Sequence, residues 1–230
     1  MNEAALLTKP RCIPQRDNGK MTIKLHCFGE SGNAYKAALT LTLADVAWEP
    51  VFVDFFKGET RTPAYRALNV MGEVPVMVDG DLVLTQSGVI QDYITSKTSK
   101  LGAKSANQRR DILRWMFFDN HKISSQAGTL RFNMNFLPED KRNADVNAFV
   151  SARLHGGLKV LETQLGDTNW LAGDEMTIAD LACCGYLYYP EDFTFDRTAY
   201  PHIDRWLDAI AATPGWKAPY DLMPRALPAA

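Results

Sequence analysis

Gln86 and Ser87 are polar residues at the predicted start of a helix, a place where an anion can bind. A helix N-terminus carries partial positive charge and unpaired main-chain N–H groups, so it attracts carboxylates. The Ser87 hydroxyl adds a donor, and the side-chain oxygen of Gln86 could orient an amino group beside the anion. An ordinary serine N-cap has the same local pattern. The pair therefore predicts either a carboxylate site or a helix cap alone.

Ser31 lies in a similar position, at the start of a helix that we expect from Gly32 onward. A hydroxyl that donates to an anion stabilises that anion by ~1.5–3 kcal/mol. The positive end of the helix adds ~0.3–1 kcal/mol to this stabilisation. The alternative is that Ser31 only caps the helix, although a capping serine could serve both purposes in turn.

The pattern of cysteines and histidines favours structural roles for these residues over catalytic or metal-binding ones. The 4 cysteines (Cys12, Cys27, Cys183 and Cys184) include no C-x-x-C pair, and the 4 histidines (His26, His121, His155 and His202) lack ligand spacing. Buried, reduced thiols and the absence of a structural metal are the expectations. A cytoplasmic, reducing compartment fits this cysteine usage.

Charge and hydropathy exclude several classes of function. Lysine plus arginine number 25 against 27 aspartate plus glutamate, a formal net charge of -2, so we expect no nucleic-acid or membrane partner. No apolar run has the length of a membrane span. Residues 1–20 have no secretory signal pattern and are interpreted as an extension of uncertain origin.

Strand and helix signals alternate from residue 21 to residue 98. Runs of β-branched and aromatic residues predict the strands, Asp79-Gly80 predicts a hairpin, and Pro63 suits the first turn of a helix. The expected order is β-α-β-α-β-β-α, with strands at 23–28, 49–55, 74–78 and 82–84 and helices at 32–43, 63–68 and 87–98.

Strand signals stop in the second half of the chain. Helical periodicity predicts helices at about 107–134, 139–165, 177–189 and 201–212. The expected organisation is therefore an α/β domain at 21–98, a linker at 99–106 and an all-helical domain at 107–230.

Three motifs, in this order, resemble those of the cytosolic glutathione S-transferase family. They are Gly72-Glu73-Val74-Pro75-Val76 before the hairpin, Gln86-Ser87 at the next helix, and the stretch from Trp170 to Asp180 before a late helix. The resemblance covers residues 21–220 and is closest to the theta-like and phi-like branches that use serine. It implies a thioredoxin-like α/β domain followed by an all-α domain, glutathione as co-substrate, and a homodimer.

The resemblance also implies how glutathione is bound. The Val74–Pro75 peptide bond is expected to be cis, and the Val74 main chain to pair with the cysteinyl residue of glutathione. Gln86 and Ser87 are expected to hold the γ-glutamyl end. Arg61, with Lys57 as a weaker candidate, is expected to hold the glycyl carboxylate. Glu73 departs from the family pattern, because an amide or a basic residue is more usual there.

The family activates the glutathione thiol with a side chain near the first helix. Ser31 matches the serine of the theta-like and phi-like branches, and Asn33 is the second candidate. Lowering a thiol pKa by ~2 units from about 8.5 requires ~2.7 kcal/mol, which one hydroxyl and one helix end can supply. Cys27 lies within a strand and is a poor nucleophile candidate.

The electrophile is expected between the Gly29–Ser31 loop and the first long helix of the second domain, with Phe28 among the pocket residues. Trp115, Phe118 and His121 lie on that helix at i, i+3, i+6 spacing, although such a stripe also suits core packing. Transfer of glutathione to an electrophilic carbon is the leading function. Glutathione-dependent disulfide or peroxide reduction is the alternative, favoured if Asn33 faces the sulfur. A binding-only role on the same fold is a third possibility.

Overall fold

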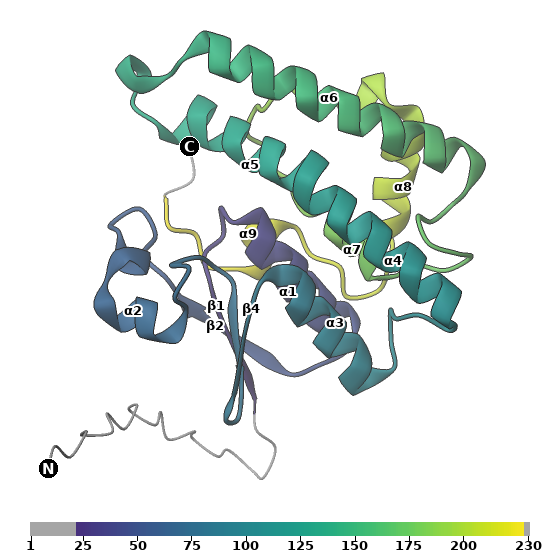
Figure 1. The fold of residues 1–230 in the computed structure, drawn as a ribbon, viewed down its shortest axis with the longest axis horizontal. Coiled ribbons are helices and arrows are strands. Elements are labelled where there is room, and N and C mark those ends of the chain that lie inside the picture. The colour runs from purple at the N-terminus through teal and green to yellow at the C-terminus, as the bar shows by residue number, and fades with distance from the viewer. Residues whose placement is uncertain (1–21, 228–230) are drawn as a thin grey trace, which may run out of the picture.

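The computed structural model describes residues 22–227 of the chain (Figure 1). The predicted extension at residues 1–20 lies outside the described residues, as does Cys12. The first half has the expected order of strands and helices. Its elements are β1 (Ile23–Cys27), α1 (Gly32–Leu43), β2 (Trp48–Phe52), α2 (Pro63–Leu68), β3 (Val76–Asp79), β4 (Leu82–Thr85) and α3 (Ser87–Thr98), with a 3-10 turn η1 (Glu59–Arg61) before α2.

The four strands form one mixed sheet in the order β2-β1-β3-β4. β1 pairs parallel with β2 and antiparallel with β3, and β3 and β4 form the predicted hairpin around Gly80, whose φ is 64°. Side chains alternate between the faces of the sheet, as a strand requires. Met77 packs into the core beneath α1 and α3, whereas Val76 packs with Tyr65 of α2 on the other face.

The second half is helical, with irregular segments between its helices. Its elements are α4 (Ala106–Phe118), η2 (Asp119–Ser124), α5 (Ser125–Arg131), η3 (Phe132–Phe136), η4 (Glu139–Lys141), α6 (Ala144–Asp167), α7 (Ile178–Cys183), η5 (Arg197–Ala199), α8 (Pro201–Ala211) and α9 (Pro219–Leu222). Figure 1 shows α4, α5 and α6 as a layer above α1 and α3, with the sheet and α2 beyond. Helix α7 packs against α1, α3 and α4, so one core joins the two halves.

Several predicted boundaries are wrong. The first two strands end earlier than expected, at Cys27 and Phe52. The helix expected at 107–134 is one continuous helical stretch that widens into π-helical turns, η2 and η3, on either side of α5. The helix expected at 177–189 ends at Cys183, and that expected at 139–165 begins as η4 and continues as α6 only from Ala144. A π-helical turn has more residues than an α-helical turn. The apolar periodicity of the sequence did not reveal these wider turns.

The motif before α7 acts as a structural anchor. Thr177 caps α7 and the Asp180 side chain accepts from the Thr177 main-chain N–H, which forms the expected capping box. Asp180 also accepts from Leu171 N at 2.9 Å and from Trp206 Nε1 at 3.0 Å. One buried carboxylate therefore joins the loop before α7, the start of α7, and α8.

None of the helices within residues 22–227 is both long and apolar enough to cross a membrane.

Candidate active site

A small cleft, of about 20 Å³, lies where the edge of the sheet meets the starts of α1 and α3. Its lining includes six of the predicted site residues. The lining residues are Asn33, Asn69, Glu73, Val74, Pro75, Gln86, Ser87 and Asn120. The volume is too small to enclose a peptide, so a ligand here would lie along the surface and pair with the exposed main chain.

Val74 presents its main chain at this cleft. The Val74–Pro75 peptide bond is cis, as expected. Within the described residues, neither the N–H nor the C=O of Val74 has a main-chain partner. The preceding carbonyl, that of Glu73, is held by Tyr65 Oη at 3.0 Å and Asn69 Nδ2 at 2.8 Å. An extended peptide could therefore pair with Val74 in the manner of an added strand.

Sequence reasoning did not identify Asn69. This residue is buried, and its Oδ1 accepts from Met71 N at 3.1 Å while its Nδ2 holds Glu73. Asparagine often stabilises turns through such local bonds. Its position directly after α2 and before Gly72 is the signal that could have identified it.

Gln86 and Ser87 begin α3, but Ser87 is not its N-cap. Gln86 is the N-cap residue, with φ 68° and no capping bond from its side chain, and Ser87 is the first helical residue. A positive φ at a residue other than glycine costs about 1–3 kcal/mol. This conformation leaves the Ser87 hydroxyl in the cleft beside the helix end. The prediction of a serine cap is therefore wrong, while Ser87 does line the cleft.

Glu73 lies in the cleft with its carboxylate beside Gln86. Gln86 Nε2 donates to Glu73 Oε2 at 3.0 Å and contacts Met71 Sδ at the same distance. The amide oxygen of Gln86 has no partner within the described residues. The cleft thus contains a carboxylate next to the positive end of α3, and these two groups suit the ammonium and the carboxylate of an amino-acid zwitterion.

Ser31 and Asn33 have different environments. Ser31 caps α1, because its Oγ accepts from Ala34 N at 3.2 Å, and its residue is 8% exposed. Ser31 is not among the residues that line the cleft, whereas Asn33 is. Within the described residues, the Asn33 carboxamide makes no hydrogen bond. Its N–H groups are thus free to donate to an anion in the cleft.

The loop before Ser31 is held by the helical half. Tyr189 Oη donates to Gly29 O at 2.7 Å, and the buried Arg131 donates from Nη1 to Glu30 O at 2.8 Å. The Glu30 carboxylate accepts from the main-chain N–H groups of Ala226 and Leu227. These contacts order the segment that leads into α1 and the candidate site.

The two candidate cations lie outside the cleft. Arg61 ends the turn η1 and is exposed. Lys57 is also exposed and pairs with Asp54 at 2.9 Å, which raises the pKa of Lys57 and lowers that of Asp54. The structure does not bring either residue to the cleft lining.

The expected electrophile-pocket residues divide between separate environments. Phe28 is buried and stacks on Phe55, with ring centroids 4.9 Å apart. Trp115 is buried in the core and meets Phe118 edge-on, whereas His121 is exposed. The structure therefore does not assemble these four residues into one cavity, and Trp115 serves the core.

Cys27, Cys183 and Cys184 are buried and free, as expected. Burial raises the pKa of the Cys27 thiol to about 12, so it is not ionised near neutral pH. No group of three histidine, cysteine or carboxylate residues suited to a metal occurs in the described part of the chain.

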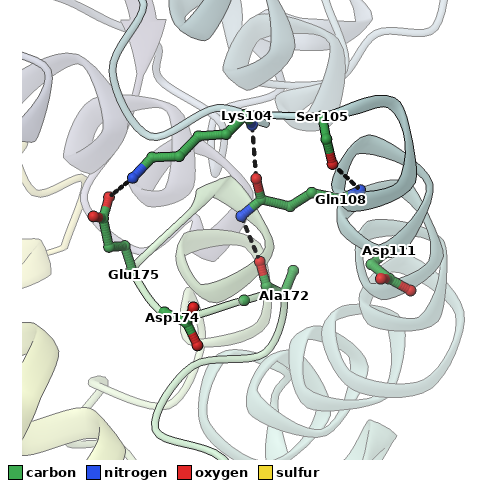
Figure 2. A pocket seen from close by; sticks show the side chains of 8 residues that line it. Lys104, Ser105, Gln108, Asp111, Ala172, Asp174 and Glu175 are labelled. Carbon is green, nitrogen blue, oxygen red and sulfur yellow. Dashed lines mark hydrogen bonds and ion pairs between the residues drawn. The ribbon is translucent and has the colours of Figure 1, made fainter.

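A larger hollow, of about 350 Å³, lies elsewhere, between the start of α4 and the loop before α7. Figure 2 shows that Lys104 pairs with Glu175 in this hollow and that Gln108 donates to Ala172 O. It contains none of the predicted site residues, so we do not assign the function to it.

Two family models match the chain. Residues 21–96 match the model described as glutathione S-transferase, N-terminal domain, and residues 127–214 match the model described as glutathione S-transferase, C-terminal domain. Together they cover most of the chain, and the first spans seven of the eight residues that line the cleft.

Individual proteins give the same result. Glutathione S-transferase F10 of Arabidopsis thaliana is 31% identical over 79% of this chain and 89% of its own length. Glutathione S-transferase 3 of Zea mays is 31% identical over 85% of this chain and 91% of its own. A solved structure described as a possible glutathione S-transferase from Rhodopseudomonas palustris has 31% identity and a TM-score of 0.78, and covers 86% of this chain and 97% of that one.

Proposed function

This chain belongs to the glutathione S-transferase family, and we propose that it binds glutathione along the cleft at Val74 and ionises the thiol of the bound peptide. It is an enzyme of that family. The observation that carries the proposal is the cleft itself, in which an unpaired main-chain edge, a helix N-terminus and free side-chain donors meet.

The proposed pose follows from the chemistry of the lining. The cysteinyl residue of glutathione pairs with the main chain of Val74. The γ-glutamyl carboxylate lies at the start of α3, where Ser87 and unpaired N–H groups receive it. The α-ammonium lies against Glu73 and the free amide oxygen of Gln86. Arg61 or Lys57, both exposed, is the proposed partner of the glycyl carboxylate.

Asn33 is the proposed direct donor to the thiolate, because its carboxamide lines the cleft without a partner. Ser31 remains the alternative donor, since its oxygen accepts from Ala34 N while its O–H stays free to donate. In either case the N-terminus of α1 adds to the stabilisation of the negative charge.

Two reactions use such a thiolate. Transfer of the sulfur to an electrophilic carbon, with release of a leaving group such as chloride, is the leading function. Disulfide reduction is the second candidate, and the position of Asn33 in the cleft favours it. Transfer stays the leading function because the relatives that match most of the chain are described as glutathione S-transferases. In disulfide reduction the thiolate attacks one sulfur, forms a mixed disulfide with glutathione, and releases the other sulfur as a thiolate.

Paired assays test these functions. With glutathione present, we expect turnover of a chlorinated nitroaromatic, and turnover of a small mixed disulfide would identify the reductase instead. Retention on immobilised glutathione with turnover of neither substrate would assign a binding-only role. Absence of glutathione binding by folded protein would remove the proposal.

Glu73 provides a prediction about affinity. The change Glu73→Gln is expected to weaken glutathione binding about 10-fold, because the α-ammonium loses a charged partner worth ~1.5 kcal/mol. Calorimetry with glutathione and with its desamino analogue measures this: the parent should prefer glutathione, and the variant should prefer neither. Glu175→Gln, an exposed glutamate far from the cleft, is the control. Tighter binding by Glu73→Gln would mean that the carboxylate repels the peptide.

The chain is further proposed to form a homodimer, with the α/β domain of one subunit against the helices of the other. Large apolar side chains that are exposed in the single chain, among them Val70, Met71, Val89 and Phe117, support this. The proposed units are the domains at 21–98 and 107–230, and the proposed compartment is the cytoplasm.

Phe117→Glu tests the dimer. Phe117 is 72% exposed on α4, and a carboxylate there would be desolvated in an interface, so we expect the variant to sediment as a monomer. Phe149→Glu places the same charge at a 64% exposed phenylalanine on α6 and should leave the parent's state unchanged. The assignment of the surface is wrong if Phe117→Glu and the parent have the same mass.

A further inference from the structure

Asn120 is the one lining residue of the cleft that comes from the helical half. The other lining residues lie between positions 33 and 87. Within the described residues, the Asn120 carboxamide makes no hydrogen bond, as is also true of Asn33. Two free carboxamides, one from each half of the molecule, therefore face the same small cleft.

The course of α4 explains how Asn120 reaches the cleft. A Cβ built on Gly88, near the start of α3, would lie 3.1 Å from Met116 Cε, so α4 passes close to that helix end. Asn120 follows four residues later, in the π-helical segment η2. π-turns are uncommon and frequently occur at functional sites. Here the wide turn places Asp119 in the core and Asn120 in the cleft.

A buried polar network ties η2 to α1. Lys36 Nζ contacts Asp119 Oδ2 and Ser124 Oγ, and Ser124 Oγ donates to Asp119 Oδ1 at 2.8 Å. Lys36 and Asp119 are each 2% exposed, and a charge that is buried so completely requires a partner. Lys36 lies one helical turn after Asn33, and Asp119 directly precedes Asn120. The network therefore connects the two segments that carry the free carboxamides.

We propose that Asn120 donates a second hydrogen bond to the sulfur of bound glutathione, and that the Lys36–Asp119–Ser124 network positions Asn33 and Asn120 around that sulfur. This inference rests on the proposed function. In the proposed pose the peptide main chain faces Val74, so its cysteinyl side chain points away from that edge, toward the wall that Asn120 contributes. A thiolate accepts several hydrogen bonds, and donors fixed before the reaction need no reorganisation.

The first test is Asn120→Ala, with Asn107→Ala at the start of the same helix as the matched control. Absorbance titration of the bound thiolate should give a pKa about one unit higher in Asn120→Ala, and kcat at pH 7 should fall about 3-fold. Calorimetric affinity for glutathione should change less than about 3-fold. If Asn120→Ala weakens binding and leaves the thiol pKa unchanged, Asn120 binds the peptide and does not contact the sulfur.

The second test is the double change Lys36→Met and Asp119→Val, which replaces the buried ion pair of the network by apolar side chains. Replacement of a buried ion pair by apolar residues often preserves stability, and thermal unfolding checks this. We expect a folded protein with a raised thiol pKa and reduced kcat. If the double variant has the same thiol pKa and the same kcat as the parent, the network does not position the two carboxamides. Calorimetry of the parent distinguishes a failure of this inference from a failure of the proposed function. If only this inference fails, the parent still binds glutathione; if the proposed function fails, the parent binds none.

Discussion

Asn33→Ala is expected to raise the pKa of the bound glutathione thiol by about 1–2 units. The reason is the loss of one hydrogen bond to a charged acceptor, worth ~1.5–3 kcal/mol, at 1.36 kcal/mol for each unit. Because a higher pKa leaves less thiolate at pH 7, kcat should fall by about 3- to 25-fold. Affinity for glutathione should change little, since the main-chain contact at Val74 and the helix end at Ser87 remain.

Ser31→Ala is the comparison that assigns the donor. Ser31 caps α1, so its loss should lower stability by about 0.5–2 kcal/mol, whatever its role in catalysis. If Asn33 is the direct donor, Ser31→Ala shifts the thiol pKa less than Asn33→Ala does. A larger shift in Ser31→Ala would identify the serine as the activating residue. Absorbance titration of both variants, saturated with glutathione, distinguishes the two results.

Asp180→Ala is expected to destabilise the fold by about 3–5 kcal/mol. The carboxylate is fully buried and accepts from Leu171 N, Thr177 N and Trp206 Nε1. Each buried donor that loses its acceptor costs about 1–3 kcal/mol. Urea unfolding should give a lower midpoint with an unchanged slope, because the exposed area changes little.

Thr177→Ala is the matched control for this change. It removes the capping hydroxyl of α7 and leaves the carboxylate of Asp180 in place, so a loss of about 0.5–2 kcal/mol is expected. Folded protein of either variant should retain the thiol pKa of the parent, because both residues lie outside the cleft. Equal losses of stability in the two variants would mean that Asp180 acts only through the capping box.

Much of the fold could be predicted from the motifs at Val74-Pro75, Gln86-Ser87 and Thr177–Asp180. Each has a local physical cause: a proline before a strand, a polar residue at a helix start, and a capping pair. Local causes can be recognised without a three-dimensional structure. Ser87 marks the limit of this reasoning, because its helix begins one residue earlier than a serine cap requires.

The helical wall of the site could not be predicted in the same way. Asn120 lines the cleft because η2 contains a π-turn and because Lys36, more than 80 residues earlier, pairs with Asp119. A contact between such distant residues leaves no periodic signal in the sequence. The predicted stripe of Trp115, Phe118 and His121 lies in the segment that contains Asn120. Its members Trp115 and Phe118, however, pack in or against the core. The functional candidate is the polar residue beside them.

The central claim is that glutathione binds at the Val74 edge and loses its thiol proton on binding. Calorimetric titration of glutathione at pH 7, in buffers of different ionisation enthalpy, measures both the affinity and the protons released. A free thiol with pKa about 8.5 that shifts by ~2 units should release about 0.7 proton for each peptide bound, and S-methylglutathione should release none. Binding without release of a proton, or no binding by folded protein, would contradict the account.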